Sequence, residues 1–143
     1  MRRRREAGSA AIEAAVGLPA FMLFVALVIL AGRLAIATQA VEASASEAAR
    51  VASIARTQGA ASGAATAAAT SSLANQNLHC VRSTVSVNTA GFDVPVGTPA
   101  QVTATVACVV NLADLSLPGV PGTRTVSATA TSPIDTYRER GGS

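Results

Sequence analysis

The hydrophobic and polar positions of the chain form three successive patterns. The first is a continuous apolar run from Ala14 to Gly32, in which no residue is charged. As an α-helix with a rise of about 1.5 Å per residue, this run is roughly 28 Å long, close to the hydrocarbon thickness of a bilayer. Lipid offers no water to the backbone, so a spanning segment must be helical. The pattern predicts a transmembrane anchor helix over residues 9–33.

The second pattern is amphipathic and covers residues 34–77, which we expect to form an Ala-rich helical stalk outside the membrane. Polar and small apolar residues alternate at three-to-four-residue spacing, so the anchor helix should continue beyond Arg33. The polar stripe is Gln39, Glu42, Ser46, Arg50, Ser53 and Thr57, and the apolar stripe is Ala37, Val41, Ala45, Ala48, Ala52 and Ala55. This apolar stripe suits either a helix of a neighbouring subunit or the chain's own head domain.

Two glycines interrupt the stalk and predict a break near residues 59–63. Gly59 and Gly63 lower helix stability there, and the following segment Ala64–Asn77 is again rich in Ala. Its composition suits either a short helix or a low-complexity linker.

The third pattern is period-two alternation of Val and Thr, which predicts a small β head over residues 78–143 that ends in a C-terminal tail. Strands are expected over Val81–Thr89, Gln101–Leu112 and Thr123–Thr131, joined antiparallel through Gly- and Pro-containing loops. Phe92, Val94 and Val96 offer a short fourth strand. The predicted fold class is therefore α+β: a transmembrane helix that extends into an extracytoplasmic helix, followed by an antiparallel sheet of three to four strands.

Composition indicates that this head has a weak core. Hydrophobic residues make up 50% of the chain but aromatic residues only 3%, so most apolar side chains are Ala and Val, which bury little area. The two cysteines, Cys80 and Cys108, are expected to form a disulfide outside the cytoplasm. Cys80 falls on the polar positions of the alternating pattern, so we expect it just before its strand begins.

The charge of the chain is concentrated at its start. The net charge is +3, all basic residues are arginine, and four of these are the consecutive Arg2, Arg3, Arg4 and Arg5. A basic cluster beside an apolar span favours a cytoplasmic N-terminus, so we interpret it as a topology signal rather than a nucleic-acid patch. A secretory signal peptide cleaved near Ala35-Ile36-Ala37 is the competing interpretation.

An acid at the start of the apolar segment is unusual for a plain anchor. Glu13 follows Gly8 by five residues, and a basic stub, residues 1–8, precedes a possible cut after Gly8. Such a cut would leave Ser9 as the new N-terminus with Glu13 at its fifth position. This arrangement resembles a type IV prepilin processing site. The alternative is a carboxylate that reaches the cytoplasmic interface beside Arg5.

Further segments of the chain make this resemblance more specific. Together they resemble TadE-like proteins, the pseudopilin-type components of tight-adherence (Flp) pilus systems: Gly8-Ser9-Ala10-Ala11-Ile12-Glu13, Leu18-Pro19, Ala48-Ala49-Arg50 and the stretch 127–131. In place of the Tyr common after the glutamate, this chain has Ala14. The resemblance implies a pilin-like fold, a membrane aspartyl prepilin peptidase that removes the leader, and a glutamate that offsets the new amino terminus. It also implies partners: other pilin or pseudopilin subunits and the assembly platform, met through the anchor helix.

We expect no enzymatic activity, no cofactor, no metal and no nucleic-acid partner. His79 beside Cys80 supplies too few ligands for a zinc site, and Asp93, Asp114 and Asp135 fall in predicted loops or the tail. The leading hypothesis is a structural and assembly role as a single-pass membrane protein. The second is a membrane-tethered or secreted binding module without a pilus role.

Overall fold

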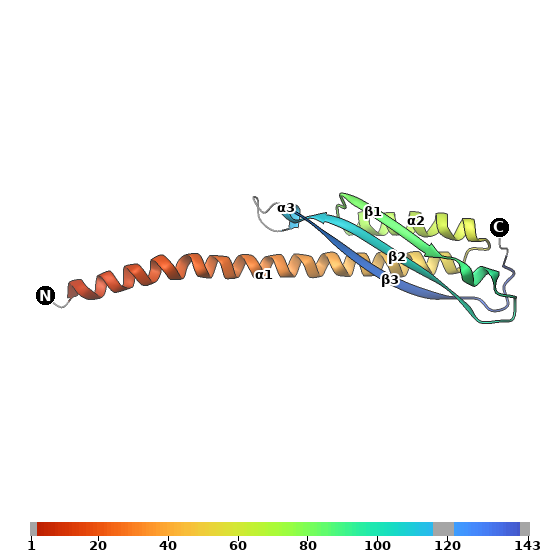
Figure 1. Cartoon of the computed structure of the whole chain (residues 1–143), viewed down its shortest axis with the longest axis horizontal. Helices are drawn as coiled ribbons and strands as arrows, with labels where there is room; N and C mark the ends of the chain where they lie inside the picture. Colours follow the sequence, from red (N-terminus) through yellow and green to blue (C-terminus); the bar gives the residue numbers. More distant parts are fainter. Residues whose placement is uncertain (1–2, 116–121, 141–143) are drawn as a thin grey trace.

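The computed structural model of the chain describes residues 3–115 and 122–140, and it describes side chains over 12–113 and 122–140. In chain order the elements are α1 (Arg3–Ser53), α2 (Gln58–Asn75), β1 (Arg82–Asn88), the 3₁₀ helix η1 (Ala90–Asp93), β2 (Ala100–Asn111), α3 (Leu112–Leu115) and β3 (Thr123–Ile134). The α+β class is as predicted. Figure 1 shows α1 as the long axis of the molecule, with every other element gathered on its C-terminal half.

α1 is one helix of 51 residues that continues from the apolar run into the amphipathic segment. It passes through Pro19, which removes one backbone donor without ending the helix. The predicted continuation of the helix beyond Arg33 is confirmed.

The break between the helices lies at residues 54–57 and not at 59–63. Thr57 is the N-cap of α2, and its hydroxyl accepts a hydrogen bond from the backbone N–H of Ala60 at 3.2 Å. Such a cap is worth about 1 kcal/mol, whereas a glycine inside a helix costs a similar amount. Gly59 and Gly63 therefore lie within α2, whose packing offsets their cost.

α2 is a true helix rather than a linker. It buries Ala61, Ala65, Ala69 and Leu73, one residue per turn, on the side that packs against α1 and the sheet. Small side chains let two helices approach closely. At the end of α2, Gln76 donates from Nε2 to the carbonyl of Ala40 in α1 at 3.2 Å, which ties the helices together.

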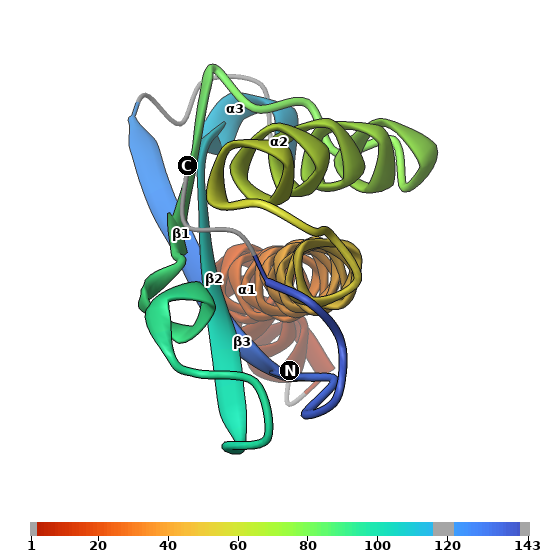
Figure 2. The ribbon, with the colours of Figure 1, turned by 90° about the vertical axis from the view of Figure 1, so that its right-hand side faces the viewer.

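The sheet has the order β1-β2-β3, and both pairs are antiparallel. In register, Val106 of β2 lies opposite Val85 of β1 and Ala128 of β3. Alternate residues of the central strand are buried, as predicted: Val102, Ala104, Val106, Cys108 and Val110. Figure 2 shows the resulting two layers, with the sheet on one side and α1 and α2 on the other.

The apolar stripe of α1 packs on the chain's own head. Val41, Ala45, Ala48 and Ala52 have an exposed fraction of 0% and belong to the same cluster as the buried residues of β2. Of the two uses we considered for this stripe, the structure therefore shows the intramolecular one. Residues 37–53 are part of the head and not a free stalk.

The predicted fourth strand is wrong, because residues 90–93 form η1 instead. The backbone N–H of Phe92 donates to the carbonyl of Thr89 at 2.9 Å, and the ring turns inward until it is 2% exposed. Burying this ring closes the end of a core that is otherwise built from Ala and Val.

A disulfide joins Cys80 and Cys108, with the Cα atoms 5.4 Å apart and a sequence separation of 28. Cys80 lies just before β1, as its parity predicted. Closing a loop of this length stabilises a domain by roughly 3–4 kcal/mol in the chain-entropy model. That gain matters for so small a core.

Candidate membrane anchor and processing site

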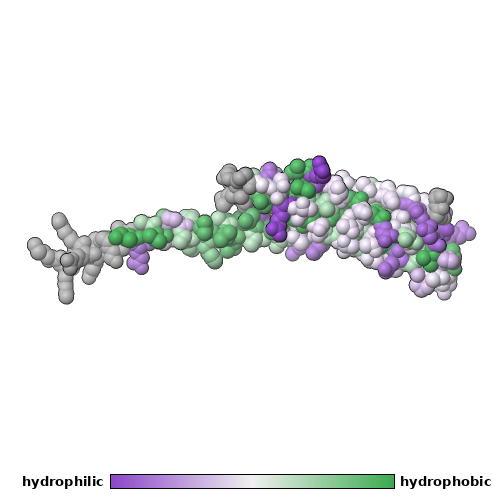
Figure 3. Space-filling model, in the orientation of Figure 1, coloured by the Kyte–Doolittle hydropathy of each residue, from purple (hydrophilic) through white to green (hydrophobic). Residues whose placement is uncertain are grey.

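The N-terminal half of α1 is apolar and lies outside the head. Residues Ile12–Ser53 form a helix long and apolar enough to cross a membrane, and its most apolar window is 0% buried. Figure 3 shows this half as a mostly hydrophobic rod that extends away from the mixed surface of the head. The following large side chains are between 46% and 69% exposed: Ile12, Val16, Leu18, Phe21, Met22, Leu23, Phe24, Leu27, Val28 and Ile29.

So large an exposed apolar surface is unfavourable in water. Burial in lipid or against other apolar helices removes that cost. α1 is therefore a candidate membrane anchor, consistent with a single-pass membrane protein.

The predicted processing residues share one continuous helix. The backbone of Gly8 and Ser9 belongs to α1, while the side chain of Ser9 lies outside the described part of the chain. Glu13 follows within the same helix, and its side chain is exposed. Residues four apart in a helix are neighbours on one face, with Cβ atoms roughly 5–6 Å apart. A charge carried by residue 9 would therefore lie close to the Glu13 carboxylate.

The four arginines of the predicted topology signal are only partly described. Arg2 lies outside the described residues. The backbone of Arg3, Arg4 and Arg5 forms the first turn of α1, and their side chains are not described.

Neither the Cys80–His79 pair nor the aromatic residues of the head form a candidate site. Cys80 is held in the disulfide, so it has no thiol to offer a metal or a substrate beside His79. A ligand surface of a binding module would be favoured by clustered aromatic residues, but Phe92 is in the core and Tyr137 is 86% exposed. These positions do not form a shared aromatic patch.

Comparison with known proteins finds one similarity, in the N-terminal part of the chain. The model of the TadE-like protein family matches residues 8–50. This segment of the chain is similar to the TadE-like family. No curated protein and no solved structure matches the chain. The TadE-like segment begins at Gly8, contains Glu13 and the apolar run, and ends in the helix that packs on the sheet.

A cluster of hydrogen bonds that holds the far end of the head was not predicted from the sequence. The guanidinium of Arg140 donates to five backbone carbonyls: those of Gly91, Val94, Thr98, Asp135 and Thr136, at 3.0–3.4 Å. Gln58 also donates to Asp93 at 2.6 Å. An arginine in a polar tail carries no pattern that predicts such contacts, because the carbonyls come from two loops distant in sequence.

Proposed function

We propose that this protein is a membrane-anchored minor pseudopilin of a tight-adherence (Flp) pilus or a related secretion system, with a structural rather than catalytic role. The observation that carries the proposal is the TadE-like match, which covers the exposed apolar half of α1 together with Gly8 and Glu13. The anchor helix would insert among other pilin-type helices or the assembly platform, while the head is displayed outside.

The proposed topology places the N-terminus in the cytoplasm and the head outside it. The cluster Arg2–Arg5 favours this orientation. The Cys80–Cys108 disulfide supports it independently, because disulfides persist in oxidising compartments and are rare in the cytosol.

The proposed processing step is hydrolysis of the Gly8–Ser9 peptide bond by a prepilin peptidase. Water supplies the atoms that leave a carboxylate on Gly8 and a new amino group on Ser9. Within the continuous helix α1 this amine lies one turn from Glu13. An ammonium and a carboxylate attract each other strongly where the dielectric constant is low, so the pair would lower the cost of placing either charge among apolar helices.

In vivo photo-crosslinking tests the structural role. A benzophenone amino acid at position 21, where Phe21 is 60% exposed in the apolar half, should form adducts with other pilin-type subunits or the assembly platform. Glu13→Gln should weaken these adducts, whereas Glu42→Gln, a matched change at an exposed position of the same helix, should not. Adducts with lipid alone would contradict the pilus role and favour a simple tethered binding module.

A further inference from the structure

The end of the head nearest the anchor lies within the lipid headgroup layer if α1 spans a bilayer, so this inference rests on the proposed membrane anchor. Arg33 is the first charged residue after the uncharged run Ala14–Gly32, and it marks the outer limit of the hydrocarbon. The head already buries α1 at Ala37, which is 1% exposed. Four residues of helix are about 6 Å, and a headgroup layer is roughly 5–8 Å thick.

Three parts of the fold contribute residues to this end of the head, which we name the membrane-proximal face. Its residues are Arg33 and Ile36 of α1, His79, Val81 and Arg82 around the start of β1, and Arg124 at the start of β3. A cleft of about 230 Å³ lies between α1 and the turn before β1. It is lined by Arg33 and Ile36 of α1 and by Asn77 and Leu78 of the turn.

The register of the sheet brings two of the arginines to the same end of β2. Arg82 is paired with Val109, and Arg124 is paired with Val110. Figure 1 shows this end of the sheet, beside α3, as the part of the head closest to the apolar half of α1. The side chains of Arg82 and Arg124 are both exposed.

The described acids of the head lie away from the membrane-proximal face. Among the residues whose side chains are described, no acid lies on the membrane-proximal face. Glu42 lies about 13 Å beyond Arg33 along α1. The remaining described acids of the head are Glu47 on α1, Asp93 in η1, and Asp135 and Glu139 after β3. Asp114 belongs to α3, which follows β2 at this end, and its side chain lies outside the described part of the chain. Counting its one negative charge against the three arginines leaves a positive formal charge.

The same face also exposes apolar side chains. Ile36 and Val81 are each 66% exposed, next to arginines on α1 and β1 respectively. Arginine donates several hydrogen bonds to phosphate oxygens, while aliphatic side chains gain by leaving water for the acyl boundary. The combination matches the chemistry of a phospholipid surface.

We propose that the membrane-proximal face docks the head onto anionic phospholipids of the outer leaflet. Docking gives the protein a second attachment to the membrane besides the anchor helix. It fixes the tilt of the head relative to the bilayer before the protein contacts other subunits. The occupant is the lipid surface itself, since the positive balance of the face complements anionic headgroups and the face is continuous with the anchor.

Tryptophan fluorescence of the full-length protein in vesicles tests the proposal, because the chain has no tryptophan of its own. Val81→Trp places a reporter on the membrane-proximal face, and Val96→Trp, at a residue that is 51% exposed in the loop before β2, is the matched control. In vesicles that contain phosphatidylglycerol with brominated acyl chains, the reporter at position 81 should be quenched at least twice as strongly as the one at position 96.

Quenching at position 81 should fall when phosphatidylcholine replaces the anionic lipid. It should also fall when Arg82→Gln and Arg124→Gln are added, by roughly fivefold in the docked-to-undocked ratio for each charge removed. Equal, weak quenching at both positions would overturn the docking proposal. Flotation of the same samples is the separate control: protein that fails to float with the vesicles would contradict the membrane anchor itself.

Discussion

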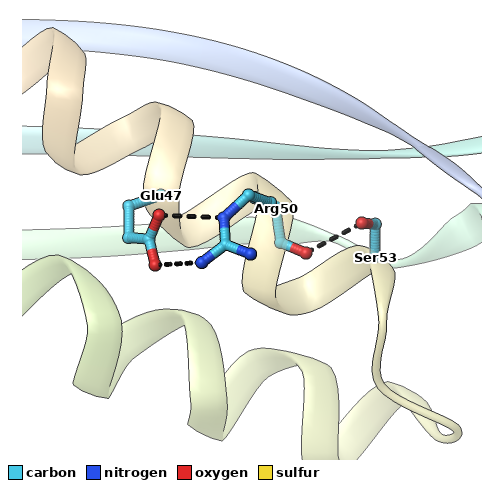
Figure 4. A network of polar contacts seen from close by, with 3 residues as sticks. All are labelled: Glu47, Arg50 and Ser53. Carbon is cyan, nitrogen blue, oxygen red and sulfur yellow. Dashed lines mark hydrogen bonds and ion pairs between the residues drawn. The ribbon is translucent and has the colours of Figure 1, made fainter.

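Ser132 of β3 donates a hydrogen bond to the hydroxyl of Ser53, the last residue of α1, at 3.0 Å and across 79 positions of sequence. Ser53 in turn donates to the carbonyl of Arg50 at 2.8 Å, as Figure 4 shows. Ser53 is only 6% exposed although it lies on the predicted polar stripe. The end of the anchor helix is thus fixed to the edge strand of the head.

Loss of this hydroxyl should destabilise the head. Ser53→Ala leaves Ser132 and the helix end without one partner each, so we expect the free energy of unfolding to fall by about 1 kcal/mol. Ser46→Ala, at an exposed position of the same helix, should be neutral or slightly stabilising, because Ala is the better helix former. Urea denaturation in detergent, followed by circular dichroism, measures both; equal effects would contradict the assigned contact.

Replacing glycine by alanine should change the stability of the head in opposite directions at two positions. A Cβ on Gly91 would overlap the backbone carbonyl of Gln101, and the side chain of Ile134 also lies close to it. Gly63 lies inside α2, and a Cβ there would meet nothing within 4 Å. Gly91→Ala should therefore destabilise by roughly 1–3 kcal/mol, whereas Gly63→Ala should stabilise by up to about 1 kcal/mol. The same denaturation experiment would contradict the packing if both variants shifted stability in one direction.

The ion pair on α1 should be visible in a titration. Glu47 accepts from Nη2 and Nε of Arg50 at 2.7 and 3.0 Å (Figure 4). The hydrogen bonds from Arg50 hold the pKa of Glu47 below its ordinary value of 4.5. Because the folded-state pKa is depressed, any stabilisation is present above that value and is lost as the pH falls through the folded pKa. The pair is exposed, so its contribution is small and weakens with salt.

NMR of the Glu47 carboxyl carbon checks this prediction. Its midpoint should lie below 4.5 in the native protein and return to the ordinary range in Arg50→Gln. Arg56→Gln, beyond the end of the helix, should leave the midpoint unchanged. A midpoint that is the same in all three proteins would contradict the pairing.

Periodicity predicted the long helix and the three strands because each pattern extends over many residues. Strand β2 is an example: period-two alternation of Val and Thr assigned its buried face, and the pattern also put Cys108 on that face. The disulfide followed from the count of cysteines and the compartment.

Tertiary contacts decided what local patterns did not. The position of the helix break depended on the Thr57 cap and on packing that keeps two glycines inside α2, and the short helix η1 formed because the Phe92 ring fills the end of the core. Arg82 and Arg124 of the membrane-proximal face are far apart in sequence, and only the sheet register brings them to the same end of β2. We inferred the processing site at Gly8, Ser9 and Glu13 from a motif. The structure adds that these residues share one helix.

The measurement that tests the central claim most directly is the intact mass of the membrane-extracted protein, expressed with and without a prepilin peptidase. A processed pseudopilin should lose residues 1–8 only when the peptidase is present. Gly8→Val should block that loss, while Gly17→Ala, a glycine in the same helix with open space around it, should not. An intact leader in the presence of an active peptidase, or a start near Thr38, would contradict the account.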